Sequence, residues 1–484
     1  MVPPGDDEHD CGWKSYAEQL QSQLSKVLEV QQAQQAELDT LKRQLLGKKS
    51  EKMPPMDREV RRGKEPDLEA ALRTRRANAE LRAKKLETQT IELPVPQRDR
   101  CCPKCGGEDF SPIGDGKPSS ITEYIPGYFR KRIFRRQQLA CACGQHVIIA
   151  PVPDKVFDKT QYGPGFMAHL VVSKCCDSIP LYRLEKQFHR LGVPMARSTM
   201  TDLFQRVGST LRIIARRILA MVAASDIVLA DETSNRMQTA DKKAYIWAFV
   251  AENLIAYRFN PNRSGETPTD VLGGTRGTLV VDMYTGYNSV TGVDGRERAG
   301  CLAHARRKFF EALSVTPEAQ FALDRILEVY RVEHEARERG ISRTPDHERM
   351  RWERSLPAMD RLYVWLVEQR GLHPPKGKMG IALRYAMRNW QALTRFIRDV
   401  RLPPDNNRSE SALRVVALGR KNFLFVGHEE AGHNLAALYT VVATCEANGV
   451  EPLAYLTDTL LRLDSTPADR IDDLLPQNWA PLAT

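Results

Sequence analysis

Two apolar runs decide which fold this chain can adopt: Asp226-Ile-Val-Leu-Ala-Asp231 and Gly277-Thr-Leu-Val-Val-Asp282. Short apolar runs of this length predict buried strands. Between them, residues 245–250 and 254–259 predict a hairpin, and a helix is expected near Thr267 to Leu272. The order of strand, hairpin, helix and strand predicts a mixed α/β sheet.

Each of the two runs ends in an aspartate. Asp231 and Asp282 would stand at the carboxyl ends of neighbouring buried strands, where like charges repel strongly. A divalent cation relieves that repulsion, and carboxylate oxygens suit Mg²⁺ or Mn²⁺. Two such ions, about 3.5 to 4 Å apart, can activate an attacking hydroxyl and stabilise the leaving oxygen of a phosphodiester, given a third carboxylate. Either aspartate alone is more simply interpreted as a strand-end cap or turn acid.

The composition indicates a soluble globular protein of two to four domains. Of the 484 residues, 42% are hydrophobic and 27% charged, a balance that excludes a membrane protein or a wholly disordered chain. No apolar run reaches the roughly 18 residues of a membrane span, and the first ten residues contain four acids instead of a signal sequence. We therefore expect a cytoplasmic location and no membrane partner.

Basic charge gathers in one part of the chain. Lys and Arg number 71 against 61 Asp and Glu, and residues 41–150 alone hold 24 basic against 14 acidic residues. Such asymmetry predicts a polyanionic partner, most simply nucleic acid. A solvated charged surface is the alternative interpretation.

A heptad pattern occupies residues 13–46, which contain no proline. The seam consists of Ala17, Leu20, Leu24, Val27, Gln31, Gln34, Leu38, Leu41 and Leu45. This spacing predicts a self-associating coiled coil and thereby a homo-oligomer, although a lone amphipathic helix packed on its own protein has the same pattern. Residues 47–100, rich in Lys, Arg, Glu and Pro, are interpreted as a basic linker.

A cysteine cluster begins the next unit, residues 101–155. In Cys102-Pro-Lys-Cys105 the two-residue gap lets two thiolates bind one Zn²⁺ ion, and Cys141, Cys143 and His146 follow further along the chain. The fourth ligand stays open between Cys143 and His146. Buried cysteines without metal are the alternative.

Alternating residues at Thr122 to Tyr128 and Arg130 to Leu139 predict two strands within this cysteine unit. Strands between paired metal ligands are typical of a zinc ribbon, with the ion in a structural role. The unit is therefore predicted to be a zinc-binding ribbon.

Residues 160–220 have helical periodicity. The apolar residues from Leu181 to Leu191 form one helix face, Gly192-Val193-Pro194 interrupts it, and a second helix is expected to start with Ser198 or Thr199 as its cap. Two short helices around such a turn predict a DNA-binding helix-turn-helix, although an ordinary helical hairpin looks alike. The candidates to contact DNA are Arg197, Ser198, Thr199 and Arg206.

Four blocks of the C-terminal half resemble the signature of one protein family. They are Asp231-Glu-Thr233, Asp282-Met-Tyr-Thr-Gly-Tyr287, Cys301-Leu-Ala-His304-Ala-Arg-Arg-Lys-Phe309 and Asp405-Asn-Asn-Arg-Ser-Glu410-Ser-Ala-Leu-Arg414. With the coil, the cysteine unit and the helical region in the same order, they are similar to the insertion-sequence-66 family of DDE transposases. The resemblance covers nearly the whole chain.

Together with the segments above, the resemblance implies a multidomain α+β fold. The N-terminal coiled coil, zinc-binding ribbon and helix-turn-helix would precede an RNase H-like mixed α/β catalytic domain. That domain would comprise residues 225–310 and 401–450, with a helical insertion at 311–400 between them and a C-terminal segment at 451–484.

The resemblance also implies which residues act. Asp231, Asp282 and Glu410 would form the triad that binds two Mg²⁺ or Mn²⁺ ions. The enzyme would cleave DNA at the terminal inverted repeats of a bacterial insertion sequence and join the 3′-hydroxyls to target DNA. Accessory proteins encoded by the same element are plausible partners. Phosphate contacts would fall on Arg263, Arg306 and Arg307, and Cys301 and His304 form a Cys-x-x-His motif found in several DDE groups.

Two departures from the family pattern stand out. The metal unit of the family usually ends in Cys-x-x-Cys, whereas Cys141-Ala-Cys143-Gly144 shifts the last thiol. Met283 stands where the family usually has Gly, which alters the loop after Asp282 but leaves the carboxylate in place.

Glu410 has a structural alternative, since Asn407 could be an N-cap and Glu410 its partner in a capping box. Asp405, in irregular chain, and Glu429-Glu430, in an expected turn, are less rigidly placed candidates for the third carboxylate. Two other functions compete with transposition: a catalytically silent DNA-binding protein, and an RNase H-like nuclease without strand transfer.

Overall fold

The computed structural model describes residues 127–140, 147–150, 155–158, 160–238 and 243–481, with isolated positions nearer the N-terminus. The predicted coil and linker lie almost entirely outside the described residues. So do all five zinc candidates, Cys102, Cys105, Cys141, Cys143 and His146. Residues 48–128 form one compact unit and the rest of the chain another, which contains every strand and helix with described bounds.

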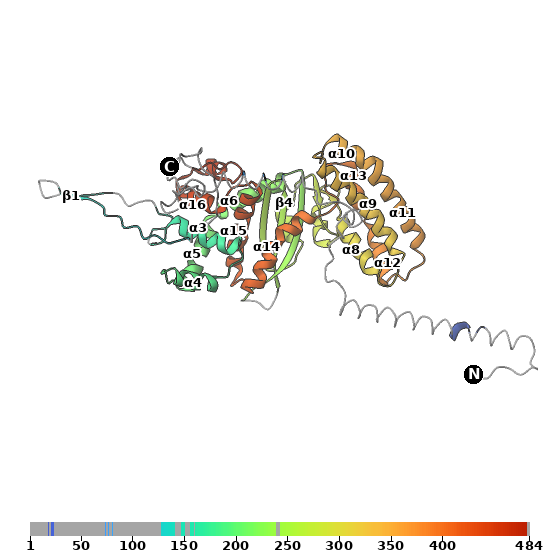
Figure 1. Ribbon diagram of the computed structural model, residues 1–484, viewed down its shortest axis with the longest axis horizontal. Helices are drawn as coiled ribbons and strands as arrows, with labels where there is room; N and C mark the ends of the chain where they lie inside the picture. The colour runs from blue at the N-terminus through green and yellow to red at the C-terminus, as the bar shows by residue number, and fades with distance from the viewer. Residues whose placement is uncertain are drawn as a thin grey trace, which may run out of the picture. The chain divides into compact units, whose positions relative to one another are not determined.

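A five-stranded mixed sheet lies at the centre of the second unit (Figure 1). Its strands are β3 (Ile227–Arg236), β4 (Lys243–Ala251), β5 (Leu254–Asn260), β6 (Thr278–Val280) and β7 (Glu297–Ala299), in the order β5-β4-β3-β6-β7. Strands β3, β4 and β5 run antiparallel, whereas β3, β6 and β7 run parallel. The predicted mixed α/β sheet and its hairpin are therefore confirmed.

The first apolar run was predicted to end at Asp231, which is wrong. Strand β3 continues to Arg236, and Asp231 lies in its middle opposite Ala248 of β4. The polar residues after Asp231 stay in the strand because the long hairpin partner supplies a continuous ladder of backbone hydrogen bonds. Asp282 does follow its strand, two residues after Val280.

Helix α15 (Glu429–Ala447) protects the outer edge of β5. The Thr440 hydroxyl accepts from the backbone N–H of Tyr257 at 2.8 Å, and the Thr444 hydroxyl both accepts from the N–H of Ile255 and donates to its carbonyl. Both threonines are buried. The edge groups that would otherwise face solvent or another chain thus have partners inside the molecule.

Among the helices with described bounds, four precede the sheet: α3 (Pro164–Cys175), α4 (Leu181–Arg190), α5 (Arg197–Thr210) and α6 (Arg212–Ala224). Between α4 and α5 the chain turns at Gly192, whose φ of 77° favours glycine. Helix α5 begins at Arg197 with Ala196 as its N-cap and has no side-chain cap, so the predicted cap at Ser198 or Thr199 is wrong. The helix expected near Thr267 is α7 (Glu266–Leu272).

Helices α8 to α13 gather beside the sheet (Figure 1), where α13 packs against β7. They are α8 (Leu302–Ala312), α9 (Ala319–Glu338), α10 (Pro345–Met350), α11 (Leu356–Gln369), α12 (Lys378–Arg388) and α13 (Trp390–Arg398). The predicted breaks near residues 340 and 374 are confirmed. Arg351, fully buried among these helices, donates to both carboxylate oxygens of Glu333 at 2.8 Å and to the carbonyl of Phe396.

In the described residues after α13, the α-helices are α14 (Asn407–Phe423), α15 and α16 (Pro452–Arg462), and two short 3-10 helices follow at Leu463–Ser465 and Ala468–Leu474. The turn predicted at Glu429-Glu430 is wrong, because these residues begin α15 and the His428 side chain accepts from the N–H of Ala431 as its cap. The two negative charges in that first turn suit the positive end of the helix dipole.

Near the cysteine unit, the structure describes a small antiparallel pair, β1 (Gln138–Ala140) and β2 (Val147–Ile149). The predicted strand from Arg130 to Leu139 is therefore mostly wrong, since residues 130–137 are in no strand and pairing begins only at Gln138. The other predicted strand, Thr122 to Tyr128, lies almost wholly outside the described residues.

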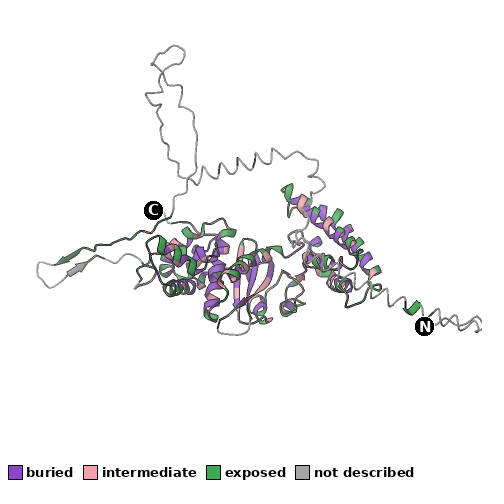
Figure 2. Cartoon of the chain, turned by 60° about the horizontal axis from the view of Figure 1, so that its bottom comes forward, coloured by how far each residue is buried: buried purple, intermediate pink, exposed green. Residues whose placement is uncertain are grey.

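The buried residues concentrate in the strands and on the helix faces that meet them (Figure 2). Trp247, Phe249 and Phe259 of the hairpin are fully buried in this core. Among the described residues, no helix is long and apolar enough to cross a membrane.

Candidate active site

Asp231 lies in the central strand β3, and Asp282 lies just beyond the end of the neighbouring strand β6. Leu229 of β3 pairs with Val280 of β6 in parallel register. Asp231 comes two residues after Leu229 and Asp282 two residues after Val280, so the two aspartates are expected on the same face. Each carboxylate is oriented by the backbone: Asp231 Oδ1 accepts from the N–H of Glu232, and Asp282 Oδ1 from the N–H of Tyr284, both at 2.9 Å. The parallel pairing of β3 with β6 therefore brings two carboxylates together.

The pKa of Asp231 is raised to about 7. Burial is the largest cause, and the negative charges of Glu232, Glu410 and Asp282 add to it. Charges that act on one carboxyl group in this way must lie close to it. Asp231, Asp282 and Glu410 thus form one acidic cluster, although they are far apart in the sequence.

Glu410 is the fourth residue of α14, after the N-cap Asn406. Its N–H donates to the carbonyl of Asn406 at 3.2 Å, as in any first helical turn. The N–H of Asn407, the residue proposed as cap, donates instead to Asp405 Oδ1 at 3.0 Å. The capping-box interpretation of Glu410 is therefore wrong, and its half-buried carboxylate is available for another role.

Asn406 joins the helix that carries Glu410 to the strand that carries Asp231. Its side-chain amide donates to the carbonyl of Ala230 at 2.8 Å, and its N–H donates to the Sγ of Cys301 at 3.3 Å. Asn406 is only 1% exposed. Asn406 was not among the predicted site residues; the one signal for it in the sequence is its position directly before a helix that follows Pro403-Pro404.

Cys301 and His304 also lie at the acidic cluster. Cys301 is fully buried at the start of α8, and His304 Nδ1 is 3.8 Å from Glu410 Oε1. One donor atom from each of Cys301, His304 and Glu410 falls within 4.8 Å of the others. The Cys-x-x-His motif and the third carboxylate, over 100 residues apart, therefore meet in space.

Arg263, a predicted phosphate contact, already has a carboxylate partner. Its guanidinium donates through Nε to Glu232 Oε1 at 2.9 Å and lies 4.0 Å over the ring of Tyr284. The hydroxyl of Tyr287 donates to Glu232 Oε2 at 2.8 Å, so the buried Glu232 is fully paired. Burial raises the pKa of Glu232, and its bonds to Arg263 and Tyr287 oppose that shift. Glu232 was missed because nothing in its sequence position separates it from Asp231.

The other two predicted phosphate contacts lie on α8, the helix that carries His304. Arg306 is half-buried and lies 5.8 Å from the ring of Phe310, and Arg307 is exposed. Both residues therefore lie within the next turn of α8 after His304.

The four predicted DNA-contacting residues of α5 are not part of the acidic cluster, because α5 packs against α3, α4, α6 and α15. Arg197 forms an ion pair with Glu185 at 3.1 Å, and the guanidinium of Arg206 lies 4.0 Å over the ring of Phe157. Ser198 is exposed and Thr199 half-buried. The exposed residues of helix α5 thus form a surface separate from the acidic cluster.

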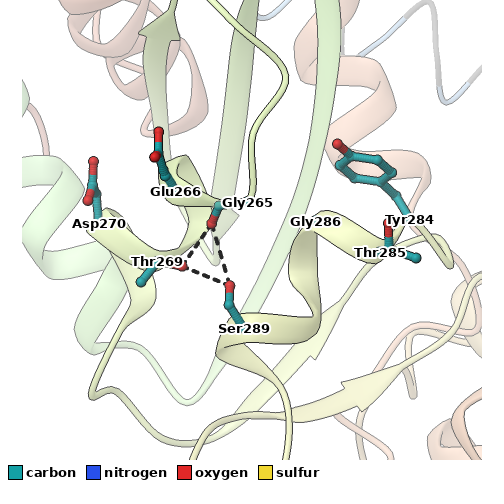
Figure 3. A pocket seen from close by; sticks show the side chains of 8 residues that line it. All are labelled: Gly265, Glu266, Thr269, Asp270, Tyr284, Thr285, Gly286 and Ser289. Atoms are coloured by element: carbon teal, nitrogen blue, oxygen red, sulfur yellow. Dashed lines mark hydrogen bonds between the residues drawn. The ribbon is translucent and has the colours of Figure 1, made fainter.

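A surface hollow beside Tyr284 does not suit phosphate (Figure 3). Its lining is Gly265, Glu266, Thr269, Asp270, Tyr284, Thr285, Gly286 and Ser289, which includes two acids and no Lys or Arg. The Thr269 hydroxyl donates to the carbonyl of Gly265 at 2.8 Å and lies 2.7 Å from the hydroxyl of Ser289. A phosphate would be repelled here, so we place the candidate site at the acidic cluster.

Comparisons with known proteins identify the family that the chain resembles. Residues 159–434 match the model of the transposase IS66 family, and residues 440–477 match the IS66 C-terminal element. Two uncharacterized proteins of Sinorhizobium fredii (strain NBRC 101917 / NGR234) are similar. Protein y4qI is 31% identical over 417 residues, covering 81% of this chain and 75% of its own length; y4jD is 30% identical over 412 residues, covering 80% of each.

Proposed function

Because the chain belongs to the IS66 family of transposases, we propose that it cleaves DNA at the ends of a bacterial insertion sequence and joins the exposed 3′-hydroxyls to target DNA. The observation that carries this proposal is the acidic cluster. The charges of Asp282, in the loop after β6, and of Glu410, on α14, both act on Asp231 in the central strand β3. The strand order β5-β4-β3-β6-β7 supports an RNase H-like catalytic domain with α8 to α13 as its helical insertion.

The cluster fits a pair of hard divalent cations. Without a cation, burial and neighbouring charge hold the pKa of Asp231 near 7, which shows that the side chain lacks compensating positive charge. Asp231, Asp282 and Glu410 would hold two Mg²⁺ or Mn²⁺ ions through oxygen ligands. When bound, such ions activate the attacking hydroxyl and stabilise the leaving oxygen of the phosphodiester.

The chain's own residues set the positions of these ligands. The bond from Asn406 to the carbonyl of Ala230 ties the start of α14 to β3 next to Asp231. The N–H of Tyr284 holds the Asp282 carboxylate. Pre-positioned ligands reduce the reorganisation needed during the reaction. Arg306 and Arg307, on the neighbouring helix α8, would meet DNA phosphates.

The remaining parts of the proposal rest on the sequence and the family. We propose that α5 contributes to binding of the terminal inverted repeats and that the N-terminal cysteines bind a structural Zn²⁺. The coil at 13–46 would assemble the homo-oligomer, accessory proteins of the same element would take part, and the protein would act in the cytoplasm. These stay predictions.

Glu410→Gln tests the proposed function directly. We expect the variant to fold and bind DNA with the flanking inverted repeats but to lose cleavage and joining by about 1000-fold or more, because several kcal/mol of transition-state stabilisation depend on the bound ions. Glu429→Gln, which changes an exposed carboxylate in the first turn of α15, is the matched control and should keep its activity.

The products distinguish the alternatives. A wild-type protein that cleaves in Mg²⁺ or Mn²⁺ but does not join a 3′-hydroxyl end to a second duplex would be a nuclease without strand transfer. Binding without any cleavage would indicate a silent DNA-binding protein. Near-normal strand transfer by Glu410→Gln would remove Glu410 from the site.

A further inference from the structure

Three donor atoms of different chemistry meet beside the acidic cluster. The Sγ of Cys301, an imidazole nitrogen of His304 and a carboxylate oxygen of Glu410 all lie within 4.8 Å of one another. Cys301 is the N-cap of α8 and His304 its third residue, a spacing that turns both side chains to the same side of the first turn. Glu410 approaches from α14, which the bond between Asn406 N–H and Cys301 Sγ holds against α8.

These donors have unused bonding capacity. The Nδ1 of His304 is buried and has no hydrogen-bond partner, and its 3.8 Å separation from Glu410 Oε1 is too long for a hydrogen bond. Cys301 Sγ accepts from the N–H of Asn406 at 3.3 Å, and its remaining lone-pair density can face an ion. An unpaired buried polar atom is costly, so a partner that both Nδ1 and the carboxylate can bind would remove a free-energy penalty.

The electrostatic surroundings favour a cation. The charges that act on the Cys301 thiol come from Asp405 and Glu410, both negative. His304 and Glu410 are only half-buried, so an ion can reach the donors from the side of the acidic cluster. The site thus combines a negative field with a route of access.

We propose that Cys301, His304 and Glu410 form a binding site for Zn²⁺. Thiolate, imidazole and carboxylate are the ligand types of protein zinc sites, whereas Mg²⁺ takes oxygen ligands. In a tetrahedral site with zinc–ligand bonds of 2.0 to 2.3 Å the ligand atoms lie about 3.3 to 3.8 Å apart, so side-chain rotations that move the donors by about 1 Å bring the three together. Binding replaces the thiol proton of Cys301, which is released to solvent, by a sulfur–zinc bond. Three protein ligands leave one position open.

Zinc binding at this site does not depend on the proposed function. Only the effect of the zinc ion on catalysis rests on that function. Glu410 would serve both this ion and the catalytic pair, so a zinc ion would occupy one of the carboxylate oxygens that the triad needs. The binding itself can be measured without DNA.

A titration of the full chain with Co²⁺, which replaces Zn²⁺ and absorbs light when a thiolate binds it, tests the proposal. The variants are Cys301→Ser and His304→Ala. The control is Cys445→Ser, another fully buried free cysteine. Because the N-terminal cysteines are also expected to bind metal, the result is read as the difference between each variant and the wild type.

We expect wild type and Cys445→Ser to bind one more Co²⁺ per chain than Cys301→Ser, with a matching loss of the sulfur-to-cobalt absorption band. His304→Ala should bind that ion more than about 10-fold more weakly. If Cys301→Ser does not fold, the half-buried His304→Ala decides. Equal stoichiometry and affinity in wild type and both variants would overturn the zinc proposal. Because the titration contains no DNA, that result would not bear on the proposed cleavage activity.

Discussion

The raised pKa of Asp231 shows that a carboxylate proposed to bind metal also lowers the stability of the metal-free fold. Burial at the centre of the sheet and three neighbouring carboxylates all disfavour its charged form. The unfolded chain ionises this group near pH 4, whereas the folded chain without metal keeps it protonated up to about pH 7. The fold therefore loses stability as the pH rises from 4 to 7, and the full penalty applies above pH 7.

We predict that Asp231→Asn raises the melting temperature of the metal-free protein at pH 8, because the amide cannot ionise. The three-unit pKa difference sets an upper limit of about 4 kcal/mol on the gain in free energy of unfolding. The gain should shrink toward zero at pH 4. Calorimetry across this range measures it, with the exposed Asp294→Asn as control. Identical melting of Asp231→Asn and wild type at pH 8 would contradict the argument.

Among the elements, helix α15 covers the edge strand β5 and supplies hydrogen-bond partners for its backbone. Its buried threonines present hydroxyls at a one-turn spacing, and these meet alternate backbone groups of β5. A valine at either position has nearly the same volume but no hydroxyl. The edge of β5 would then keep its packing and lose its hydrogen bonds.

We predict that Thr440→Val and Thr444→Val each lower the free energy of unfolding by about 1 to 3 kcal/mol, since each leaves buried backbone groups unpaired. Urea denaturation measures the change. Thr457→Val on α16 is the control, because its hydroxyl bonds only to the carbonyl of Leu453 within the same helix. A loss no larger than that of the control would show that water satisfies the β5 edge.

Helix α5 is the element to which we assign DNA recognition. We predict that Arg197→Ala and Arg206→Ala together weaken binding to the terminal repeats and reduce the salt dependence of that binding. The reason is that a protein with fewer phosphate contacts releases fewer counterions when it binds DNA. Binding isotherms at several salt concentrations measure both effects, and Arg470→Ala, another exposed arginine, is the control. Unchanged footprints would point to the zinc unit or the linker instead.

At the scale of the whole molecule, the proposed cleavage of both ends of one element would require more than one active site in a complex. The heptad seam at residues 13–46 offers a means of pairing subunits. We predict that deletion of residues 13–46 lowers the mass measured by light scattering and weakens paired-end binding, whereas deletion of residues 1–12 changes neither. Equal mass after both deletions would remove the coil from assembly.

The sequence by itself determined the local elements of this protein. Apolar periodicity located the β4–β5 hairpin, α7 and the helices between residues 303 and 399, since a period of two or 3.6 residues states which face of a segment is buried. The family blocks also placed Asp231, Asp282 and Glu410 at one proposed site. Periodicity did not reveal where β3 ends, because a hydrogen-bonded partner strand extends it past its apolar run.

Only the tertiary structure decided which distant residues meet. Asn406 bonds to Ala230 across 176 positions of sequence, Glu232 takes the guanidinium of Arg263, and His304 faces Glu410. No local pattern encodes these pairs, because they arise when separately folded segments pack and each buried polar group finds a partner. The sequence thus named the residue types of the site, and packing determined which of them share a hydrogen bond or lie close enough for their charges to interact.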